Sequence, residues 1–221
     1  MASSSTIASQ VAELKEGLTG RLPAEVAAAF AAEQAELAAG GQPGGIAVPG
    51  TVLADASLLD VRGEATGLAK AQDGRAAVLV FYRGAWCPYC NIALRTYQAQ
   101  LVPALADLGV GLIAISPQKP DGSLSMQEAN DLTYTVLSDP GSRLAGQLGI
   151  LTTGTPDAQK AQETLGLDLT AVNADGTRTL VMPTVAIVDA AGVVRWIDVH
   201  PDYTTRSEPG QILEALADAL A

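Results

Sequence analysis

The stretch Phe81-Tyr82-Arg83-Gly84-Ala85-Trp86-Cys87-Pro88-Tyr89-Cys90 decides the fold of this 221-residue chain and holds its only two cysteines. The stretch begins in an apolar run, residues 77–82, which is typical of a buried strand, and a helical pattern follows it. A thiolate at the start of a helix is stabilised by the positive end of the helix dipole, which lowers its pKa. A C-x-x-C pair on a strand-to-helix turn therefore predicts a redox site, because its sulfurs can close a small disulfide ring.

Two other interpretations of the cysteine pair are a structural zinc site and a pair of inert thiols. A structural zinc ion takes four protein ligands, and beyond Cys87 and Cys90 the chain offers one histidine, His200, so a closed site would need a second subunit. The two thiols could also be buried and inert. Trp86, Pro88 and Tyr89 instead predict an exposed turn with an aromatic shoulder, which favours redox chemistry.

Composition excludes several classes of function. Apolar residues make up 48% of the chain, which is enough for a sizeable core, and the net charge is −11. Phosphates would be repelled by that charge, so we expect no nucleic acid and no anionic membrane as partners. No apolar run is long enough to span a bilayer and no secretory signal is visible, so a cytoplasmic location is expected. In that compartment a lone C-x-x-C is more often catalytic than structural.

The first 45 residues predict a helical extension with a flexible linker. Apolar positions at helical spacing, Ile7 to Leu18, indicate one helix, and an Ala-rich segment after Pro23 indicates a second. Residues 40–50 are rich in Gly and Pro and predict a connector. The pair of helices could pack on the core, mediate a dimer contact, or do both.

Residues 46–221 alternate between strand and helix patterns, which predicts an α/β fold with a central mixed sheet flanked by helices. Strands are expected at 78–82, 110–116, 134–137, 184–189 and 193–199, the last two joined in a hairpin by residues 190–192. Helices are expected at 88–108, 123–132, 140–148, 156–165 and 208–220.

Three blocks of sequence together resemble a known family. They are the C-x-x-C block at 81–90, Leu137-Ser138-Asp139-Pro140, and Met182-Pro183 with the strand Thr184 to Asp189. Over residues 46 to 220 the chain resembles peroxiredoxin-like proteins of the alkyl hydroperoxide reductase/thiol-specific antioxidant family, which have the thioredoxin fold. This resemblance implies an antioxidant oxidoreductase that needs no cofactor, with a peroxide or disulfide as substrate and a thioredoxin-like dithiol as reductant. A homodimer is a further expectation.

The resemblance admits two alignments that assign the cysteines differently. In the peroxiredoxin alignment Cys90 is the peroxidatic cysteine, Cys87 stands where the family has Thr or Ser, and Pro183 falls near the family's active-site arginine. In the thioredoxin alignment Cys87 attacks and Cys90 resolves. Pro183 would then be a cis-proline that faces the disulfide, a form that X-Pro bonds permit.

Each alignment leads to its own reaction. In the first, Cys90 becomes a sulfenic acid and condenses with Cys87 to a disulfide, so that the protein is a thiol-dependent peroxidase. In the second, Cys87 attacks a substrate disulfide. A third hypothesis is a redox-sensing interaction module, which would react but would not turn over with a reductant.

The remaining candidates surround the cysteines. Arg83 is the favoured partner of the reactive thiolate or of the peroxide, ahead of Arg95 and Arg143. Trp86 and Pro183 would form an apolar platform, and Tyr89 would tune the turn. His200 is expected to be structural. Residues 203–206 resemble the tail of the family, without a derivable role.

Overall fold

A seven-stranded mixed sheet forms the centre of the protein, and the structure, a computed structural model, describes residues 5–220. The strand order is β2-β1-β5-β4-β3-β8-β9, and a two-stranded sheet, β6-β7, lies apart from it. The strands are β1 (Ser57–Leu59), β2 (Ala65–Gly67), β3 (Ala77–Phe81), β4 (Gly111–Ser116), β5 (Thr135–Ser138), β6 (Leu151–Thr152), β7 (Leu180–Val181), β8 (Thr184–Val188) and β9 (Val194–Val199). Strands β3, β4 and β5 are parallel, whereas β8 and β9 pair antiparallel to their neighbours.

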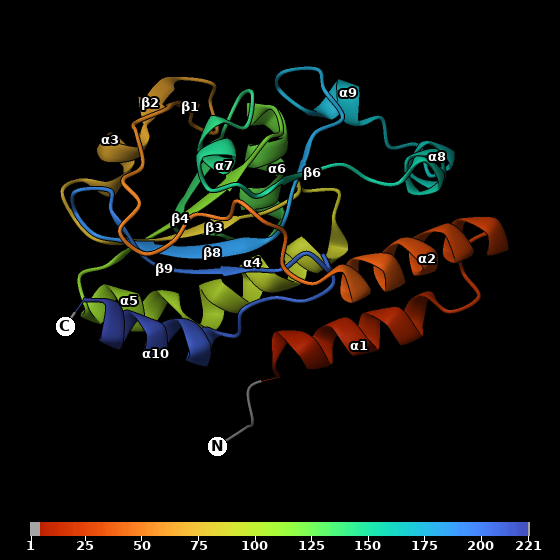
Figure 1. The fold of residues 1–221 in the computed structure, drawn as a ribbon, viewed down its shortest axis with the longest axis horizontal. Coiled ribbons are helices and arrows are strands. Elements are labelled where there is room, and N and C mark those ends of the chain that lie inside the picture. Colours follow the sequence, from red (N-terminus) through yellow and green to blue (C-terminus); the bar gives the residue numbers. More distant parts are fainter. Residues whose placement is uncertain (1–4, 221) are drawn as a thin grey trace.

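Helices cover both faces of this sheet (Figure 1). The helices are α1 (Ile7–Leu18), α2 (Ala24–Gly40), α3 (Leu68–Gln72), α4 (Pro88–Gln100), α5 (Val102–Asp107), α6 (Pro120–Ala129), α7 (Arg143–Gln147), α8 (Pro156–Thr164), α9 (Leu169–Val172) and α10 (Pro209–Ala219). None of those within residues 5–220 is long and apolar enough to cross a membrane.

The central strands are buried on both faces, so they read as continuous apolar runs. Alternate residues of β3 enter two different cores. Val78 and Val80 pack with α4, α5 and α10, and Leu79 and Phe81 pack on the opposite face with α7. The thioredoxin fold expected from the sequence is thereby confirmed, with β3 leading directly into the C-x-x-C turn.

One expected helix is divided in two. The pattern over 88–108 predicts a single helix, but the structure separates α4 from α5 at Leu101. The break lies beside Pro103, which has no N–H to donate to the preceding turn. The sequence patterns also missed the short elements β1, β2 and α3, whose three to five residues are too few to show a period.

The N-terminal helices pack against the rest of the protein. Ile7 and Val11 of α1 are buried in the same core as α4, and α2 lies against α8. The backbone N–H groups of Ile7 and Ala8 each donate to the Glu208 carboxylate at 2.9 Å. That carboxylate therefore compensates the positive end of α1. Figure 1 shows α1, α2 and α8 together at one end of the molecule.

Candidate active site

The two cysteines occupy the start of α4. Cys87 is the N-cap residue, Pro88 is the first helical residue, and Cys90 lies one turn in, with its N–H donating to the Cys87 carbonyl at 3.1 Å. The Asn91 side chain donates to the carbonyls of Ala85 and Cys87 at 2.8 and 2.9 Å, which fixes the turn. Both thiols are free and buried. The predicted position of the pair at a helix N-terminus is confirmed.

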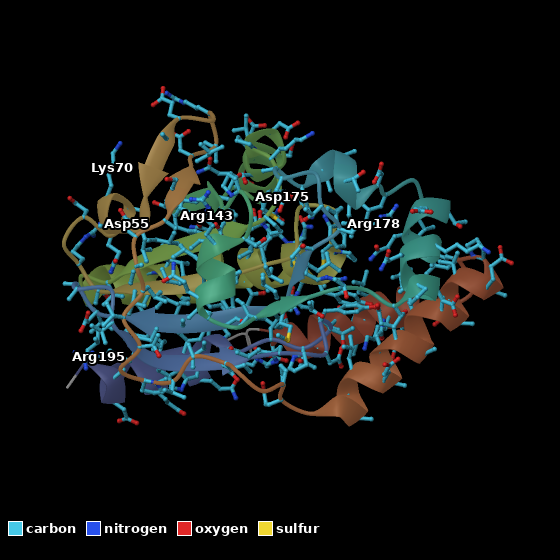
Figure 2. All side chains as sticks on the ribbon, turned by 45° about the horizontal axis from the view of Figure 1, so that its top comes forward. Asp55, Lys70, Arg143, Asp175, Arg178 and Arg195 are labelled. Atoms are coloured by element: carbon cyan, nitrogen blue, oxygen red, sulfur yellow. The ribbon has the colours of Figure 1, made fainter. Side chains whose placement is uncertain are left out.

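Arg206 donates a hydrogen bond from its guanidinium to the Cys90 sulfur at 3.1 Å. It comes from the loop between β9 and α10, far from the cysteines in sequence. Of the arginines that the sequence suggested as replacements for the family's arginine, Arg95 and Arg143 are exposed; Figure 2 shows Arg143 on α7. Sequence reasoning placed Arg206 only in a family-like tail, and no local pattern could have linked it to Cys90.

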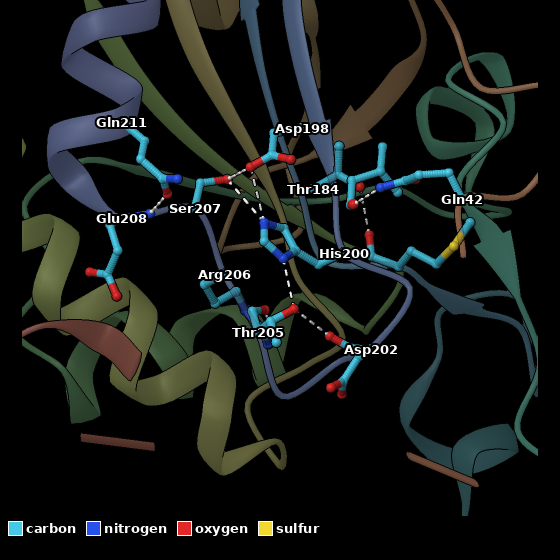
Figure 3. Close-up of polar contacts among 12 residues, drawn as sticks. Gln42, Thr184, Asp198, His200, Asp202, Thr205, Arg206, Ser207, Glu208 and Gln211 are labelled. Atoms are coloured by element: carbon cyan, nitrogen blue, oxygen red, sulfur yellow. Dashed lines mark hydrogen bonds and ion pairs between the residues drawn. The ribbon is translucent and has the colours of Figure 1, made fainter. Parts of the chain in front are cut away.

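A hydrogen-bond network holds the loop that carries Arg206 (Figure 3). His200 Nδ1 lies 2.7 Å from Thr205 Oγ1, and His200 Nε2 lies 3.1 Å from an oxygen of Asp198. Ser207 Oγ donates to the same Asp198 oxygen at 2.7 Å. His200 and Ser207 lower the pKa of Asp198, more than partial burial raises it, so the carboxylate is ionised. His200 is thus structural in this geometry: it ties both ends of the loop together.

The pKa values of the two cysteines are shifted in opposite directions. Burial by itself acts to raise the pKa of Cys90, but the Cys87 thiol, which donates to the Cys90 sulfur, and Arg206 outweigh it. The backbone N–H and the charge of Arg83 act in the same direction, and the pKa of Cys90 falls to about 5. Burial and the neighbouring Cys90 sulfur raise the pKa of Cys87 well above its ordinary value. At neutral pH the pair is therefore a Cys90 thiolate and a Cys87 thiol.

Arg83 lies between two aromatic rings. Its guanidinium carbon is 4.0 Å from the centroid of Tyr203 and 5.1 Å from that of Trp86. Such stacking stabilises a desolvated cation. Arg83 is only 5% exposed, and its side chain makes no ion pair or hydrogen bond with the residues described, 5–220. The charge of this arginine is thus available to the site.

A cavity of about 460 Å³ lies in front of Cys87. Its walls come from the first turn of α4, from the helices α1 and α2, and from the segment that follows α8. Apolar and aromatic side chains dominate the lining, namely Leu18, Leu22, Phe30, Trp86, Tyr89, Leu165, Leu167 and Tyr203, with Arg83 among the polar residues. Cys87 lines this cavity, whereas Cys90 does not. The predicted Trp86, Tyr89 and Arg83 are therefore brought together with Cys87.

Pro183 does not line the cavity in front of Cys87, and its peptide bond does not have the expected cis form. It lines a smaller cavity that Arg83 and Tyr203 also line, and neither cysteine does. No peptide bond in residues 5–220 is cis, so the cis form expected for Met182–Pro183 is wrong. Trans is the commoner form of an X-Pro bond. Here it keeps the backbone extended between β7 and β8, with the Pro183 carbonyl accepting from the His200 N–H at 2.8 Å.

The protein has the thioredoxin fold, with a C-x-x-C pair at the start of α4. Residues 49–197 match the AhpC/TSA family, and the chain belongs to that family. Membership supports an antioxidant, thiol-dependent peroxidase activity. No curated protein sequence matches the chain.

Solved structures with the same fold include three of particular interest. The peroxidoxin BcpB from Mycobacterium tuberculosis is 21% identical, with a TM-score of 0.59 over 78% of this chain and 96% of that one. Reduced Prx3 from Vibrio vulnificus in complex with H2O2 is 20% identical, with a TM-score of 0.62 over 77% and 99%. A candidate protein disulfide isomerase from Bacteroides thetaiotaomicron is 14% identical, with a TM-score of 0.52 over 79% and 91%.

Proposed function

We propose that this protein reduces hydroperoxides with Cys90 as the attacking thiolate. The observation that carries this proposal is the 3.1 Å hydrogen bond from Arg206 to the Cys90 sulfur, next to a Cys87 that stays protonated. The thiolate, not the thiol, is the nucleophile. The charge distribution thus supports the peroxidase assignment over one in which Cys87 attacks.

The reaction balances over three steps. The Cys90 thiolate attacks the terminal oxygen of R–O–O–H, the O–O bond breaks, and Cys90 becomes a sulfenic acid, while the alkoxide RO⁻ leaves and takes up a proton from water to give ROH. Cys87 then gives up its proton, its thiolate attacks the sulfenic sulfur, and the hydroxyl group leaves with that proton as water, which forms the Cys87–Cys90 disulfide. A reductant that carries two thiols restores both cysteines and leaves as a disulfide; thioredoxin is the reductant implied by the family resemblance.

Access to Cys90 imposes a condition on the first step. The Cys90 side chain is fully buried, so a hydroperoxide reaches the sulfur only when the first turn of α4 or the loop that carries Arg206 moves. Arg206 and Arg83 then lie where they can stabilise the negative charge that develops on the leaving oxygen.

A second candidate function is disulfide exchange with Cys87 as nucleophile, because Cys87 is the cysteine that lines the cavity. One experiment separates the two. Reduced wild type, Cys87→Ser and Cys90→Ser are mixed with stoichiometric hydrogen peroxide or cumene hydroperoxide, and sulfenic acid is trapped with dimedone for mass spectrometry. The peroxidase proposal expects rapid labelling of Cys90 in Cys87→Ser and none in Cys90→Ser.

The opposite pattern would transfer the nucleophile to Cys87. If peroxide reacts no faster than with a free thiol, and Cys90→Ser still attacks a model disulfide, then disulfide exchange is the function. Multiple turnover of wild type with a dithiol distinguishes either enzyme from a redox sensor that reacts once.

A further inference from the structure

The two cysteines should play different roles in the reducing step of the proposed cycle, because their pKa values and positions differ. Once the Cys87–Cys90 disulfide has formed, an incoming thiolate must attack one sulfur and expel the other. The sulfur with the lower pKa leaves faster. That sulfur is Cys90, whose thiolate is stabilised by Arg206, so attack at Cys87 is favoured.

Geometry selects the same sulfur. Both side chains are buried, with exposures of 1% for Cys87 and 0% for Cys90, but Cys87 is the one that lines the cavity of about 460 Å³. A reductant that reaches Cys87 from the cavity passes between helices α1 and α2 on one side and the segment after α8 on the other. A cavity of this size is in the range of small-molecule sites, roughly 300 to 1,000 Å³. A cavity of this volume therefore suits a small thiol.

The lining indicates the chemistry of the molecule that would enter. Leu18, Leu22, Phe30 and Leu167 offer an apolar wall, which favours a ligand with an apolar body. Arg83 lines the same cavity and is only 5% exposed. Its guanidinium has no carboxylate partner among the described residues. An unpaired buried cation attracts the anionic form of the attacking thiol.

We propose, building on the peroxidase function above, that this cavity binds a low-molecular-weight thiol with an apolar body, which reduces the disulfide in place of a protein dithiol. The bound thiolate R–S⁻ attacks the Cys87 sulfur, the Cys87–Cys90 bond breaks, and Cys90 leaves as a thiolate. A second thiol, on the same molecule if it is a dithiol, attacks the mixed disulfide at the sulfur of R. Cys87 takes up a proton, and the oxidised ligand leaves as a disulfide.

The reducing step can be measured by itself. Wild-type protein is oxidised with diamide, which makes the disulfide without peroxide, and its reduction is followed by tryptophan fluorescence in a stopped-flow instrument. The reductants are dihydrolipoamide, which has an apolar chain, dithiothreitol and glutathione, which are more polar, and reduced thioredoxin. The proposal expects dihydrolipoamide to exceed each of the other three in second-order rate constant by at least about tenfold, a difference of about 1.4 kcal/mol in activation free energy.

Two variants with matched controls locate the site. Leu165→Glu puts a carboxylate at the rim of the cavity, where Leu165 is 50% exposed, and Leu108→Glu makes the same change at a leucine that is 61% exposed on α5's end, outside the lining. Leu167→Trp fills the cavity, with Leu108→Trp as its control. Both cavity variants should slow reduction by dihydrolipoamide about tenfold or more, while the controls retain the wild-type rate.

The outcomes are distinct. Reduction by thioredoxin that is faster than by dihydrolipoamide, or cavity variants that reduce at the control rate, would overturn the small-thiol proposal. Circular dichroism of each variant establishes that it is folded before its rate is compared. Because diamide bypasses peroxide, a failure of Cys90 to react with hydroperoxides would refute the proposed peroxidase function without affecting this result.

Discussion

Arg206 and Cys90 are 116 positions apart in the sequence, yet the guanidinium of one donates to the sulfur of the other at 3.1 Å. The interaction benefits both groups. Burial acts to lower the pKa of Arg206, but the adjacent Cys90 and Cys87 sulfurs raise it, so the guanidinium keeps its charge inside the protein. A partly buried cation of this kind supplies the positive charge that a reactive thiolate needs.

Replacing Arg206 tests this interaction directly. Arg206→Gln should raise the pKa of Cys90 by about 1 to 3 pH units, the usual effect of removing an opposite charge at this distance. The ultraviolet absorbance of the thiolate, titrated in the Cys87→Ser background, measures that pKa. Arg95→Gln removes an exposed arginine on the same helix as Cys90 and should leave the titration unchanged. Equal pKa values in the two variants would show that Arg206 does not stabilise the thiolate.

The pH dependence of the reaction follows from the lowered pKa of Cys90, about 5. The rate constant with hydrogen peroxide should be flat at neutral pH and fall about tenfold for each pH unit below that value, because only the thiolate reacts. Stopped-flow fluorescence across this range provides the measurement. A midpoint near 9.0, the ordinary value of a cysteine, would contradict the proposed electrostatics.

The unfolding free energy of the reduced protein should also depend on pH through the lowered pKa of Cys90. A group whose pKa is lower in the folded state contributes stability in full above its unfolded pKa and loses it as the pH falls through the folded pKa. For Cys90 this window extends from 9.0 down to about 5. The difference in unfolding free energy between reduced wild type and Cys90→Ser, from urea titrations, should therefore shrink as the pH falls through the window. If the difference in unfolding free energy instead grows as the pH falls, the pKa of Cys90 is not lowered in the folded state.

His200 is expected to act as a positioning residue for Arg206. His200→Ala removes contacts to Thr205 and Asp198 and leaves a partly buried carboxylate with fewer partners, so it should cost about 1 to 3 kcal/mol of unfolding free energy. The pKa of Cys90 should also rise, since the loop no longer holds the guanidinium. Arg195→Ala, which breaks the ion pair between β9 and Asp189 in the turn after β8, serves as the control; Figure 2 shows Arg195 at the periphery. If His200→Ala lowers stability but leaves the pKa of Cys90 unchanged, then His200 stabilises the fold and does not position Arg206.

Glu208 should anchor the first helix and with it one wall of the cavity. Glu208→Gln removes the negative charge that accepts from Ile7 and Ala8, and we expect a loss of about 0.3 to 1 kcal/mol. Limited proteolysis near the start of α1 should become faster, and reduction by dihydrolipoamide should slow as the wall loosens. Glu214→Gln changes an exposed glutamate on α10 and should alter neither. Unchanged proteolysis in Glu208→Gln would show that other contacts hold α1.

Local sequence patterns alone predict the fold class and the place of the cysteine pair in it. The apolar run at 77–82 predicts a buried strand, and the helical pattern after it places the cysteines at 87 and 90 at the start of a helix, because both are local patterns. Trp86, Tyr89 and Arg83 were likewise found through their proximity in the chain. Such features follow from the period of the backbone and the position of its turns.

The tertiary structure alone decided which cysteine carries the charge and what surrounds the other. Arg206 reaches Cys90 because β9 pairs with β8 and β8 pairs with β3, which returns the 200–208 loop to the start of α4. The cavity before Cys87 exists because α1 packs against α4, and α2 against α8, which lies more than a hundred residues later in the chain. The pKa of a thiol depends on charges and burial within a few ångströms in space, and sequence separation does not encode those distances.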